Sequence, residues 1–519
     1  MMLPRAGGTE RGPGRDRRAA VIPAHGGRAR FTGQAPTAAV AGGGIAGIAA
    51  ATLLAERGVR VTLYEREPSL GGRLSGWPTE LSDGTTVTMS RGFHAFFRQY
   101  YNLRGLLRRV DPGLDALTRL PDYPLWHSSG LQDSFARVPR TPPLSAMGFV
   151  ALSPTFGLRD LVRMNPRAAL PLLDVRVPEV HDRLDGVSAT DFLNRIRFPE
   201  AAHHLAFEVF SRSFFADPRE LSAAELVLMF HIYFLGSSEG LLFDVPDEPF
   251  PAALWDPLHH YLQGHGVRVR TGTPVREVRP RPDGVLDITA DDRTDRYDAL
   301  VLALDSGGLR RVVAASPELG DADWRARIAR LRTAPAFLVS RLWLDRPVAR
   351  DRPGFLGTSG YGPLDNVSVL DRWEGEAARW ARRTRGSVVE LHAYAVASDA
   401  DRTTVQAEAL RQLHRIYPET RSARVVDERH AWRADCPMFP VGGYRDRPAV
   451  RSPDPAVTVA GDMVRTGLPV ALMERAATSG FLAANALLER WGVRGQTLWT
   501  VPRTGRSAVL RRLAALGAD

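Results

Sequence analysis

The stretch of chain from residue 37 to residue 65 constrains the fold more than any other, because its pattern is that of a single β-α-β unit. Thr37–Ala41 is short, small and apolar, which suits a strand buried in a parallel sheet. Residues 45–57 predict a helix that ends at Gly58, and residues 59–65 alternate like a second strand. A chain that contains this unit is expected to build an α/β fold around a parallel sheet.

The turn between this strand and this helix carries the spacing Gly42-x-Gly44-x-x-Gly47. In such a turn Gly42 permits the tight bend, Gly44 lets the backbone approach a pyrophosphate, and Gly47 lets the helix pack closely on the strand. The partly positive N-terminus of the helix, at Ile45 and Ala46, then faces the phosphates. The alternative is an ordinary glycine-rich turn between strand and helix.

Glu65 ends the second strand and is expected to accept hydrogen bonds from the hydroxyls of an adenosine ribose. Its negative charge disfavours a 2′-phosphate, so NADP is not expected at this site. The motif Gly71-Gly72-Arg73 follows: its two glycines allow the backbone close to a ligand, and Arg73 can neutralise a phosphate. A surface turn is the alternative for this motif.

Composition narrows the class of protein. The chain has 519 residues, 44% of them hydrophobic and 24% charged, which is ample material for a large folded core. Its net charge is +10, but all 68 basic residues are arginine, which indicates composition bias rather than selection for a nucleic-acid partner. Cys436 is the only cysteine, so the chain cannot form an internal disulfide, a CxxC zinc site or an iron–sulfur cluster with its own cysteines.

A second motif lies in the last quarter of the chain, where Gly461-Asp462 follows a short apolar strand and leads into a helix with Met473 and Ala476. Together with residues 40–73, this motif resembles the FAD-binding signature of the amine oxidase and phytoene desaturase superfamily. The resemblance implies that Asp462 binds the ribityl–pyrophosphate part of FAD and that the following helix points its N-terminus at the flavin.

The resemblance implies FAD as the cofactor, with the backbone of Val275 touching adenine. The expected cofactor-binding residues are Gly42, Gly44, Ile45, Ala46, Gly47, Glu65, Arg66, Gly72, Arg73, Arg91, Gly92, Val275, Gly461, Asp462, Met473 and Ala476.

The segment from residue 91 to residue 97 reads RGFHAFF. In phytoene desaturase relatives the matching stretch passes beside the flavin ring. His94 is the only side chain in it that titrates near neutral pH, so it is the first candidate for a catalytic base; a histidine held in a core turn is the alternative. Glu474 is a poorer candidate for the same role. The expected aromatic walls for the substrate are Phe93, Phe96 and Phe97.

Residues 92–104, 222–247 and 460–485 narrow the resemblance to the β-carotene desaturase/methylase family, the isorenieratene synthases. It covers about residues 37–490 and implies an FAD-dependent carotenoid oxidoreductase that acts on β-carotene. In this reaction the β-ionone ring loses hydride to the flavin, a geminal methyl group migrates to the neighbouring carbon, and the ring becomes aromatic. Because the chain has one cysteine, it is expected to use a separate electron acceptor rather than a Rieske centre of its own.

The fold expected is an α/β two-lobed flavoprotein, with a Rossmann-like FAD lobe of discontinuous segments and a mixed helical and β substrate lobe. The FAD lobe is expected to comprise residues 37–110, 250–315 and 450–492, and the substrate lobe residues 111–249 and 316–449. Residues 1–36 carry no apolar signal segment and are expected to be a disordered extension. Residues 493–519 are expected to be a peripheral tail.

The longest apolar run, residues 226–235, is shorter than the roughly 20 residues that a spanning helix needs. The proline-broken stretch 144–173 carries Arg159, Arg163 and Arg167, and is expected either to dip into one membrane leaflet or to cap the core. With an apolar carotenoid as partner, the expected place is the cytoplasm, in peripheral contact with the inner face of the cell membrane. No nucleic-acid partner is expected.

Two clusters of residue types have weaker implications. No metal is assigned to the histidines, because no HExxH or carboxylate-partnered spacing accompanies them. They are His203, His204, His231, His259, His260 and His265. A phenylalanine stripe predicts core packing or the lining of a long apolar channel. It consists of Phe207, Phe210, Phe214 and Phe215.

Three alternative functions stay open. The first is another desaturase or isomerase of the same fold that acts on an acyclic carotene or another terpenoid. The second is a flavin amine oxidase, whose substrate needs a deprotonated amine and an aromatic cage. The third is a basic nucleic-acid-binding scaffold that retains an inactive flavin fold, which no aromatic-interleaved basic motif supports.

Overall fold

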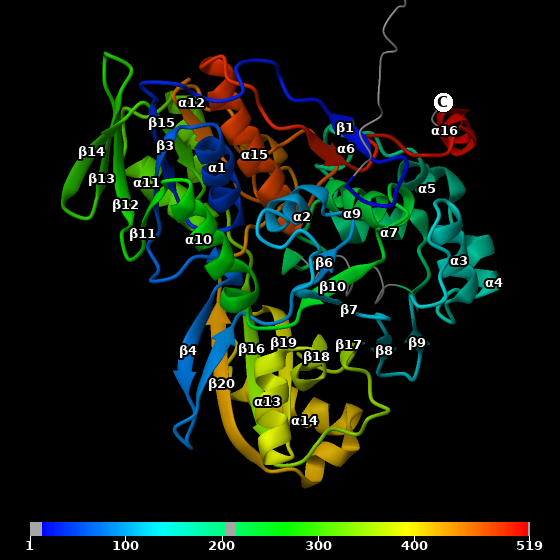
Figure 1. The fold of residues 1–519 in the computed structure, drawn as a ribbon. Coiled ribbons are helices and arrows are strands. Elements are labelled where there is room, and N and C mark those ends of the chain that lie inside the picture. The colour runs from blue at the N-terminus through cyan, green and yellow to red at the C-terminus, as the bar shows by residue number, and fades with distance from the viewer. Residues whose placement is uncertain (1–12, 201, 203–213, 517–519) are drawn as a thin grey trace, which may run out of the picture.

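A computed structural model describes residues 13–200, 202 and 214–516 of the chain (Figure 1). Within these residues, one lobe is centred on a parallel sheet of five strands in the order β11-β3-β2-β15-β21. Its strands are β2 (Thr37–Ala41), β3 (Arg60–Tyr64), β11 (Arg268–Arg270), β15 (Ala299–Leu302) and β21 (Val457–Val459). In register, Thr37 lies opposite Arg60 and Ala38 opposite Ala299. The predicted β-α-β unit is confirmed, with helix α1 (Ile45–Glu56) between β2 and β3.

Both faces of this sheet are covered, which explains why β2 consists of small apolar residues. Ala38 and Val40 share a buried cluster with α1 and other helices, whereas Ala39 and Ala41 belong to a cluster on the other face. The first face is covered by α1, α10 (Asp256–Gly264) and α15 (Leu472–Arg490). The second face is covered by α11 (Ser306–Ala314), α12 (Ala322–Ala329), β12 (Val275–Pro280), β13 (Leu286–Ala290) and β14 (Arg293–Tyr297).

Helices α1 and α15 approach each other closely. A Cβ on Gly480 of α15 would lie 2.2 Å from the carbonyl oxygen of Ala46, so only glycine allows this approach. The first residues of both helices line the same cavity, Ile45 and Ala46 from α1 and Met473 from α15. Close helix packing therefore brings two helix N-termini to one site.

The second lobe is built on a sheet of seven described strands in the order β20-β16-β19-β18-β17-β8-β9. These are β8 (Leu125–His127), β9 (Gln132–Asp133), β16 (Ala336–Leu344), β17 (Phe355–Ser359), β18 (Asn366–Val369), β19 (Ser387–Val396) and β20 (Val425–Arg433). Arg341 lies opposite Glu390 in the antiparallel pair β16–β19. Helix α14 (Arg402–Ile416) packs on one face and α13 (Gly375–Thr384) on the other, beside Trp343.

Short helices form much of the rest of this lobe, on the right in Figure 1. They are α3 (Leu144–Leu152), α4 (Leu158–Arg163), α5 (Pro166–Leu173), α6 (Glu179–Leu184), α7 (Ala189–Ile196) and α9 (Ala223–Phe230). The apolar run 226–235 becomes the end of α9 and a π-helical turn, His231–Leu235. In the described part of the chain, no helix combines the length and apolar character that crossing a bilayer requires.

The described members of the phenylalanine stripe lie in two different places. Phe214 is buried in the core of the second lobe, and Phe215 lines the cavity between the lobes, so the described members serve both expected purposes. Phe207 and Phe210 lie outside the described residues, as do His203 and His204. Across the described ranges, no group of three or more His, Cys, Asp or Glu side chains could hold a metal ion.

The expectation of a disordered extension over residues 1–36 is wrong for the residues from 13 onward. Strand β1 (Ala20–Ile22) pairs antiparallel with β22 (Leu498–Thr500), and buried Asp16 contacts Arg506. Residues 498–506 are likewise part of the fold rather than a peripheral tail. A polar segment rich in Arg and Gly becomes ordered here because a distant segment supplies its backbone partners and a counter-charge.

Two lobe boundaries also differ from the expected ones. Helix α12, expected in the substrate lobe, packs in the cluster that covers the parallel sheet. The hairpin of β4 (Gly76–Glu80) and β5 (Thr86–Ser90), expected in the FAD lobe, is bound to the second sheet, because Arg341 donates to the carbonyl oxygen of Thr88 at 2.6 Å. Packing partners, which lie far away in sequence, decide these assignments.

Candidate active site

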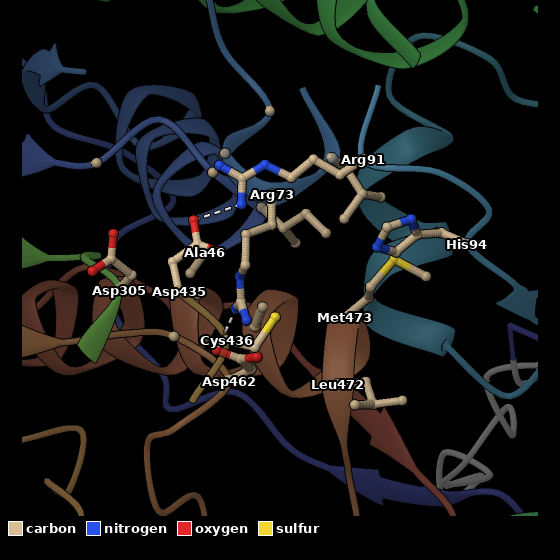
Figure 2. A pocket seen from close by; sticks show the side chains of 18 of the residues that line it. Ala46, Arg73, Arg91, His94, Asp305, Asp435, Cys436, Asp462, Leu472 and Met473 are labelled. Carbon is tan, nitrogen blue, oxygen red and sulfur yellow. Dashed lines mark hydrogen bonds and ion pairs between the residues drawn. The ribbon is translucent and has the colours of Figure 1, made fainter. Parts of the chain in front are cut away.

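A cavity of about 650 Å³ lies between the two lobes (Figure 2). The predicted cofactor-binding residues that line it are Gly42, Gly44, Ile45, Ala46, Glu65, Arg66, Gly72, Arg73, Arg91, Val275, Gly461, Asp462, Met473 and Ala476. Phe93, His94 and Phe97 line it as well. The structure thus brings the N-terminal glycine motif, the Gly461-Asp462 motif and the segment 91–97 to one site.

The glycine turn forms one end of the cavity, and its geometry suits a pyrophosphate. Gly42 has φ +109°, and a Cβ there would lie 2.2 Å from the carbonyl oxygen of Ala303. A Cβ on Gly47 would lie 1.8 Å from the carbonyl oxygen of Gly42, so α1 packs directly on the turn. At Gly44 the nearest atom to a Cβ would be Cα of Gly72 at 3.7 Å, which leaves this residue open toward the cavity.

Helix α1 begins directly after Gly44, and the helix has no side-chain cap. Its first N–H groups are therefore directed at the cavity and can serve an anion.

Glu65 lies in the cavity wall just after β3, as predicted. Its Oε2 accepts a hydrogen bond from the Gly43 N–H at 2.6 Å, and its Oε1 accepts one from the Glu67 N–H at 2.9 Å. These bonds fix the carboxylate beside the glycine turn, and burial raises the pKa of Glu65 above its usual value. The neighbouring Arg66 pairs with Asp305 at 3.3 Å. This end of the cavity fits an adenosine ribose.

Two ion pairs lie in the middle of the cavity (Figure 2). Arg73 Nη2 lies 2.6 Å from Asp462 Oδ1, and Arg91 Nη1 lies 2.5 Å from Asp435 Oδ2. The Arg91 Nε and the Asp435 Oδ1 are buried and have no hydrogen-bond partner among the described residues, which indicates a polar ligand at this point. Asp435 and the adjacent Cys436 were missed from the sequence, because they lie in a loop after β20 that carries no motif.

These features fit FAD along its whole length. The glycine turn and α1 suit the pyrophosphate, and Glu65 suits the ribose. At the other end α15 also begins without a side-chain cap, and its first residue, Leu472, has φ +52°. A strained backbone at a helix N-terminus that faces a cavity is typical of a binding site. Its dipole favours negative charge on a ring system bound there.

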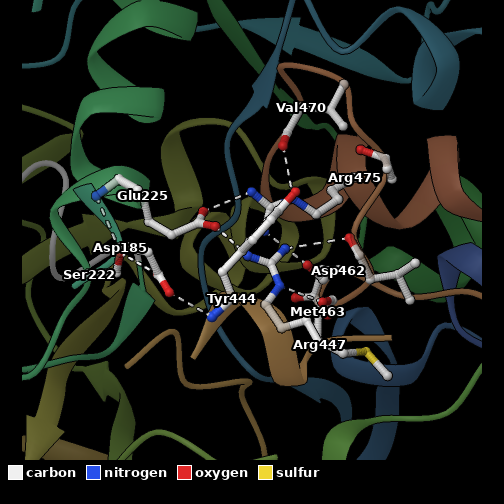
Figure 3. A network of polar contacts seen from close by, with 12 residues as sticks. Asp185, Ser222, Glu225, Tyr444, Arg447, Asp462, Met463, Val470 and Arg475 are labelled. Atoms are coloured by element: carbon white, nitrogen blue, oxygen red, sulfur yellow. Dashed lines mark hydrogen bonds and ion pairs between the residues drawn. The ribbon is translucent and has the colours of Figure 1, made fainter. Parts of the chain in front are cut away.

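A buried ionic network holds the segment that carries Asp462 (Figure 3). Glu225 Oε2 on α9 lies 2.8 Å from Arg475 Nη2, and the other carboxylate oxygen contacts Arg447. Arg475 also donates to the carbonyl oxygens of Asp462 at 3.1 Å and Val470 at 2.9 Å. Burial alone would raise the pKa of Glu225, but the two arginines hold it well below its ordinary value. The helical part of the second lobe thus fixes the cofactor-binding loop.

His94 also lines the cavity. Its Nδ1 is 2.9 Å from the carbonyl oxygen of Gly92, so the ring donates there and keeps a lone pair on Nε2. Burial lowers the pKa of His94 to about 4, so the imidazole is neutral at neutral pH. Its role as a base stays a prediction. Gly92 itself does not line the cavity; with φ +86°, a Cβ on it would lie 2.3 Å from His392 Cε1.

The prediction that Glu474 acts as a base is wrong, because the side chain lies outside the cavity wall. Its carboxylate accepts hydrogen bonds from the N–H groups of Asn102 at 2.8 Å and Leu103 at 2.9 Å. These residues open helix α2 (Tyr101–Leu107), so Glu474 caps that helix. Burial raises the pKa of Glu474 to about 8.

The prediction that Phe96 forms a substrate wall is wrong as well. Strand β6 consists of Phe96–Phe97, and successive side chains of a strand point to opposite sides. Phe97 therefore faces the cavity, whereas Phe96 is fully buried in the core of the FAD lobe.

Aromatic rings form the half of the cavity beyond His94. Phe93 stacks on Phe355 with ring centroids 3.9 Å apart, and Phe97 lies 4.6 Å from Tyr233. Others that line this half are Tyr123, Phe135, Phe215, Phe243 and Phe337. The wall also contains a short polar row with His392 and Tyr394. These two residues were missed from the sequence, because they lie on a strand whose alternating pattern resembles that of any other strand. The chamber suits an apolar, unsaturated ligand.

Comparisons with known proteins agree with this geometry. Residues 45–488 match the family described as flavin containing amine oxidoreductase. The chain belongs to this family. It is 88% identical over 515 residues to the carotenoid phi-ring synthase of Streptomyces griseus, covering 99% of this chain and 100% of that protein. It is 28% identical to the carotenoid phi-ring synthase of Chlorobaculum tepidum, covering 90% of this chain and 91% of that protein.

The fold has relatives among solved structures. Cyclohexylamine oxidase from Brevibacterium oxydans IH-35A superposes with a TM-score of 0.63 at 14% identity, covering 88% of this chain and 100% of that chain. This likeness shows the two-lobed fold. The family membership makes the protein an oxidoreductase with FAD as its cofactor, and the resemblance to the isorenieratene synthase group within the amine oxidase and phytoene desaturase superfamily is confirmed.

Proposed function

We propose that the protein aromatises the β-ring of a carotenoid, with migration of one methyl group to the neighbouring ring carbon. The observation that carries this proposal is the aromatic chamber that adjoins the FAD site and ends in Phe93, Phe97 and Phe355. The 88% identity to a carotenoid phi-ring synthase over almost the whole chain supports the substrate class. The substrate that we propose is β-carotene, as the resemblance implies.

The chemistry explains why such a chamber is needed. A β-ring becomes aromatic only when it loses hydrogens and one methyl group moves away from the carbon that carries two. Bound FAD supplies the oxidation by taking up hydride. The loss of hydride leaves positive charge on the ring, and water would trap that charge. The faces of Phe93 and Phe97 stabilise a cation, and the packed aromatic walls exclude water.

The direct test is production of the chain in a host that makes β-carotene, followed by absorbance and mass analysis of the extracted pigments. We expect a pigment with an aromatic ring and the carbon count of β-carotene. The matched control is Arg73→Gln, which removes one partner of the Arg73–Asp462 pair in the FAD site. Extracts that contain only acyclic desaturation products, or no new pigment while the protein is loaded with FAD, contradict the proposal.

We also propose that the protein reaches its substrate at an anionic membrane. Exposed apolar side chains gather on α3 and α4, with exposed fractions of 55% for Leu144, 63% for Met147 and 86% for Val162. Arg163 and Arg167, which are exposed, lie on the same stretch and add positive charge. A cytoplasmic enzyme with this surface can extract carotenoid from the inner leaflet. We further propose that the electrons pass to a separate acceptor.

Flotation with vesicles tests the membrane proposal. The protein is expected to float with phosphatidylglycerol vesicles and less with phosphatidylcholine vesicles, and Met147→Asp is expected to weaken both. Val426→Asp is the matched control, because Val426 is also exposed, at 40%, but lies on strand β20 rather than on α3 or α4. Equal flotation of the two variants would contradict this docking face.

A further inference from the structure

A row of polar side chains crosses the otherwise apolar end of the cavity. Glu390, His392 and Tyr394 stand at alternate positions of β19, so they share one face of the sheet. His392 and Tyr394 line the cavity, whereas Glu390 lies behind them and is 0% exposed. The row thus leads from the chamber into the protein interior.

Continuous hydrogen bonds connect this row. The Tyr394 hydroxyl lies 2.7 Å from His392 Nδ1, and His392 Nε2 lies 2.8 Å from Glu390 Oε1. The other oxygen of Glu390 accepts from Arg341 Nη2 at 2.9 Å, which keeps Glu390 a carboxylate. The hydrogen between Glu390 and His392 therefore belongs to Nε2, and Nδ1 accepts from the Tyr394 hydroxyl. Asn366 Nδ2 donates to the same hydroxyl at 2.8 Å.

The row lies directly beneath the segment that borders the FAD site. A Cβ on Gly92 would lie 2.3 Å from His392 Cε1, so the backbone between Arg91 and His94 passes across the imidazole. Tyr394 makes an edge contact with Phe215, another wall residue, with ring centroids 4.9 Å apart. The hydroxyl and the imidazole therefore stand next to the space in which a ring lies beside the cofactor.

Stability alone gives no reason for this arrangement. Replacement of a buried ion pair such as Arg341–Glu390 by apolar residues is often neutral or stabilising, because both charges lose their hydration. A carboxylate that orients an imidazole, which in turn meets a hydroxyl, is the arrangement that proteins use to move protons. His94 differs, since no described carboxylate hydrogen-bonds to it and its Nδ1 faces a carbonyl group.

We propose that Tyr394, His392 and Glu390 form the relay that accepts the proton lost from the substrate ring, an inference that rests on the proposed function. Tyr394 is the catalytic residue that meets the ring, His392 receives the proton, and Glu390 is the positioning residue.

The atoms and electrons of this step balance. One ring loses two hydrides in two successive oxidations. Bound FAD would accept each hydride with its two electrons and would pass the electrons to a separate quinone acceptor before the next oxidation, and each loss leaves one positive charge on the ring. The methyl group migrates with its bonding pair, which moves the charge to the adjacent carbon. A neighbouring C–H bond then breaks, its electron pair forms the new C=C bond, and its proton passes to the Tyr394 oxygen. The proton of Tyr394 passes to His392 Nδ1, and Glu390 stabilises the imidazolium.

The test compares Tyr394→Phe, His392→Gln and Glu390→Gln with the wild-type holoenzyme in vesicles that contain β-carotene. A soluble quinone is supplied to reoxidise the bound FAD, because one ring loses two hydrides and the bound FAD accepts only one at a time. We expect aromatic-ring formation to slow about 100-fold in Tyr394→Phe, within the range for loss of a general base. Bound FAD per protein and the thermal midpoint of Tyr394→Phe are expected to stay at the wild-type value, because its ring still packs on Phe215.

The matched control is Tyr361→Phe, which removes a hydroxyl between β17 and β18 outside the cavity wall. A relay also predicts that Glu390→Gln slows ring formation little further when it is combined with Tyr394→Phe. If Glu390 has only a structural role, the losses of rate from the two substitutions add. If His392→Gln or Glu390→Gln does not fold, Tyr394→Phe alone decides.

Two results overturn the relay. One is a wild-type rate in Tyr394→Phe; the other is loss of ring formation in His94→Gln with full activity in His392→Gln, which assigns the proton to His94. A wild-type holoenzyme that forms no aromatic ring is a different outcome, since it removes the proposed function itself and with it the basis of the relay.

Discussion

Arg73 and Asp462 meet across the middle of the cavity, with Nη2 2.6 Å from Oδ1, although they come from opposite parts of the chain. Arg73 follows β3 and Asp462 follows β21, which are separate strands of one parallel sheet. The carboxyl ends of parallel strands lie at one edge of the sheet, where ligands bind. The pair therefore closes the cofactor site from both sides.

Loss of either partner is expected to weaken FAD binding. Arg73→Gln and Asp462→Asn each remove a ligand-facing charge and leave the opposite charge half-buried without its partner. We expect purified Asp462→Asn to carry at most a tenth of the wild-type FAD, a loss of about 1.4 kcal/mol or more in binding. The ratio of flavin to protein absorbance measures this. Arg66→Gln, whose partner is Asp305 at the rim, is expected to lose less.

The glycine turn allows two substitutions with opposite results. Gly44→Ala points a methyl group into open space and is expected to fold normally while losing FAD, because the methyl group occupies the pyrophosphate position. Gly42→Ala places a Cβ 2.2 Å from the Ala303 carbonyl oxygen at φ +109°, and is expected to lower the melting temperature of the apoprotein. Thermal denaturation and flavin content separate the two effects. Equal melting temperatures of the two apoproteins would contradict this account of the turn.

Glu225→Gln is expected to destabilise the protein by about 3–5 kcal/mol, because it leaves Arg447 and Arg475 buried with reduced counter-charge. Since Arg475 also holds the Asp462 carbonyl group, FAD content is expected to fall as well. Chemical denaturation of the apoprotein measures the first effect. Glu318→Gln, at an exposed position, serves as the control and is expected to change neither quantity.

The ionised carboxylate of Glu390 is expected to account for part of the loss of folded-state stability at low pH. Burial would raise its pKa, but Arg341 and His392 lower the pKa of Glu390 to about 2, from an ordinary value of 4.5. A carboxyl with a lowered pKa stabilises the folded state above its ordinary pKa, and this stabilisation is lost as pH falls toward 2. The melting temperature of Glu390→Gln is therefore expected to start lower and fall less steeply between pH 4.5 and pH 2. Glu428→Gln, exposed on β20, should retain the wild-type slope.

The N-terminal segment is expected to contribute to stability. Asp16→Asn removes the charge that pairs with buried Arg506 and weakens the bond that Asp16 accepts from the Ser238 N–H at 3.0 Å. We expect the melting temperature to fall by a few degrees, with FAD content of the folded protein unchanged. Differential scanning calorimetry checks this, with Asp115→Asn at an exposed position as the control. An unchanged melting temperature would mean that the segment is only loosely attached.

Most of the cofactor site followed from the sequence, because each part of it has a local cause. Gly42, Gly44 and Gly47 are fixed by backbone geometry within one turn, and Glu65 by the end of the next strand. Predictions from neighbouring residues in the sequence failed where the contact partner lies far away along the chain. Glu474 has the chemistry of a base, but its carboxylate is occupied by the N-terminus of α2.

The sequence by itself determined the parallel sheet and the phosphate-binding turn, since periodicity and glycine spacing act over a few residues. FAD and the type of chemistry followed from the resemblance of its motifs to a known family. The tertiary structure alone decided which residues face the substrate. Asp435, His392 and Tyr394 reach the cavity because sheets and loops far apart in sequence meet there. Burial and partner charges, which exist only after folding, then set the protonation of Glu390 and His94.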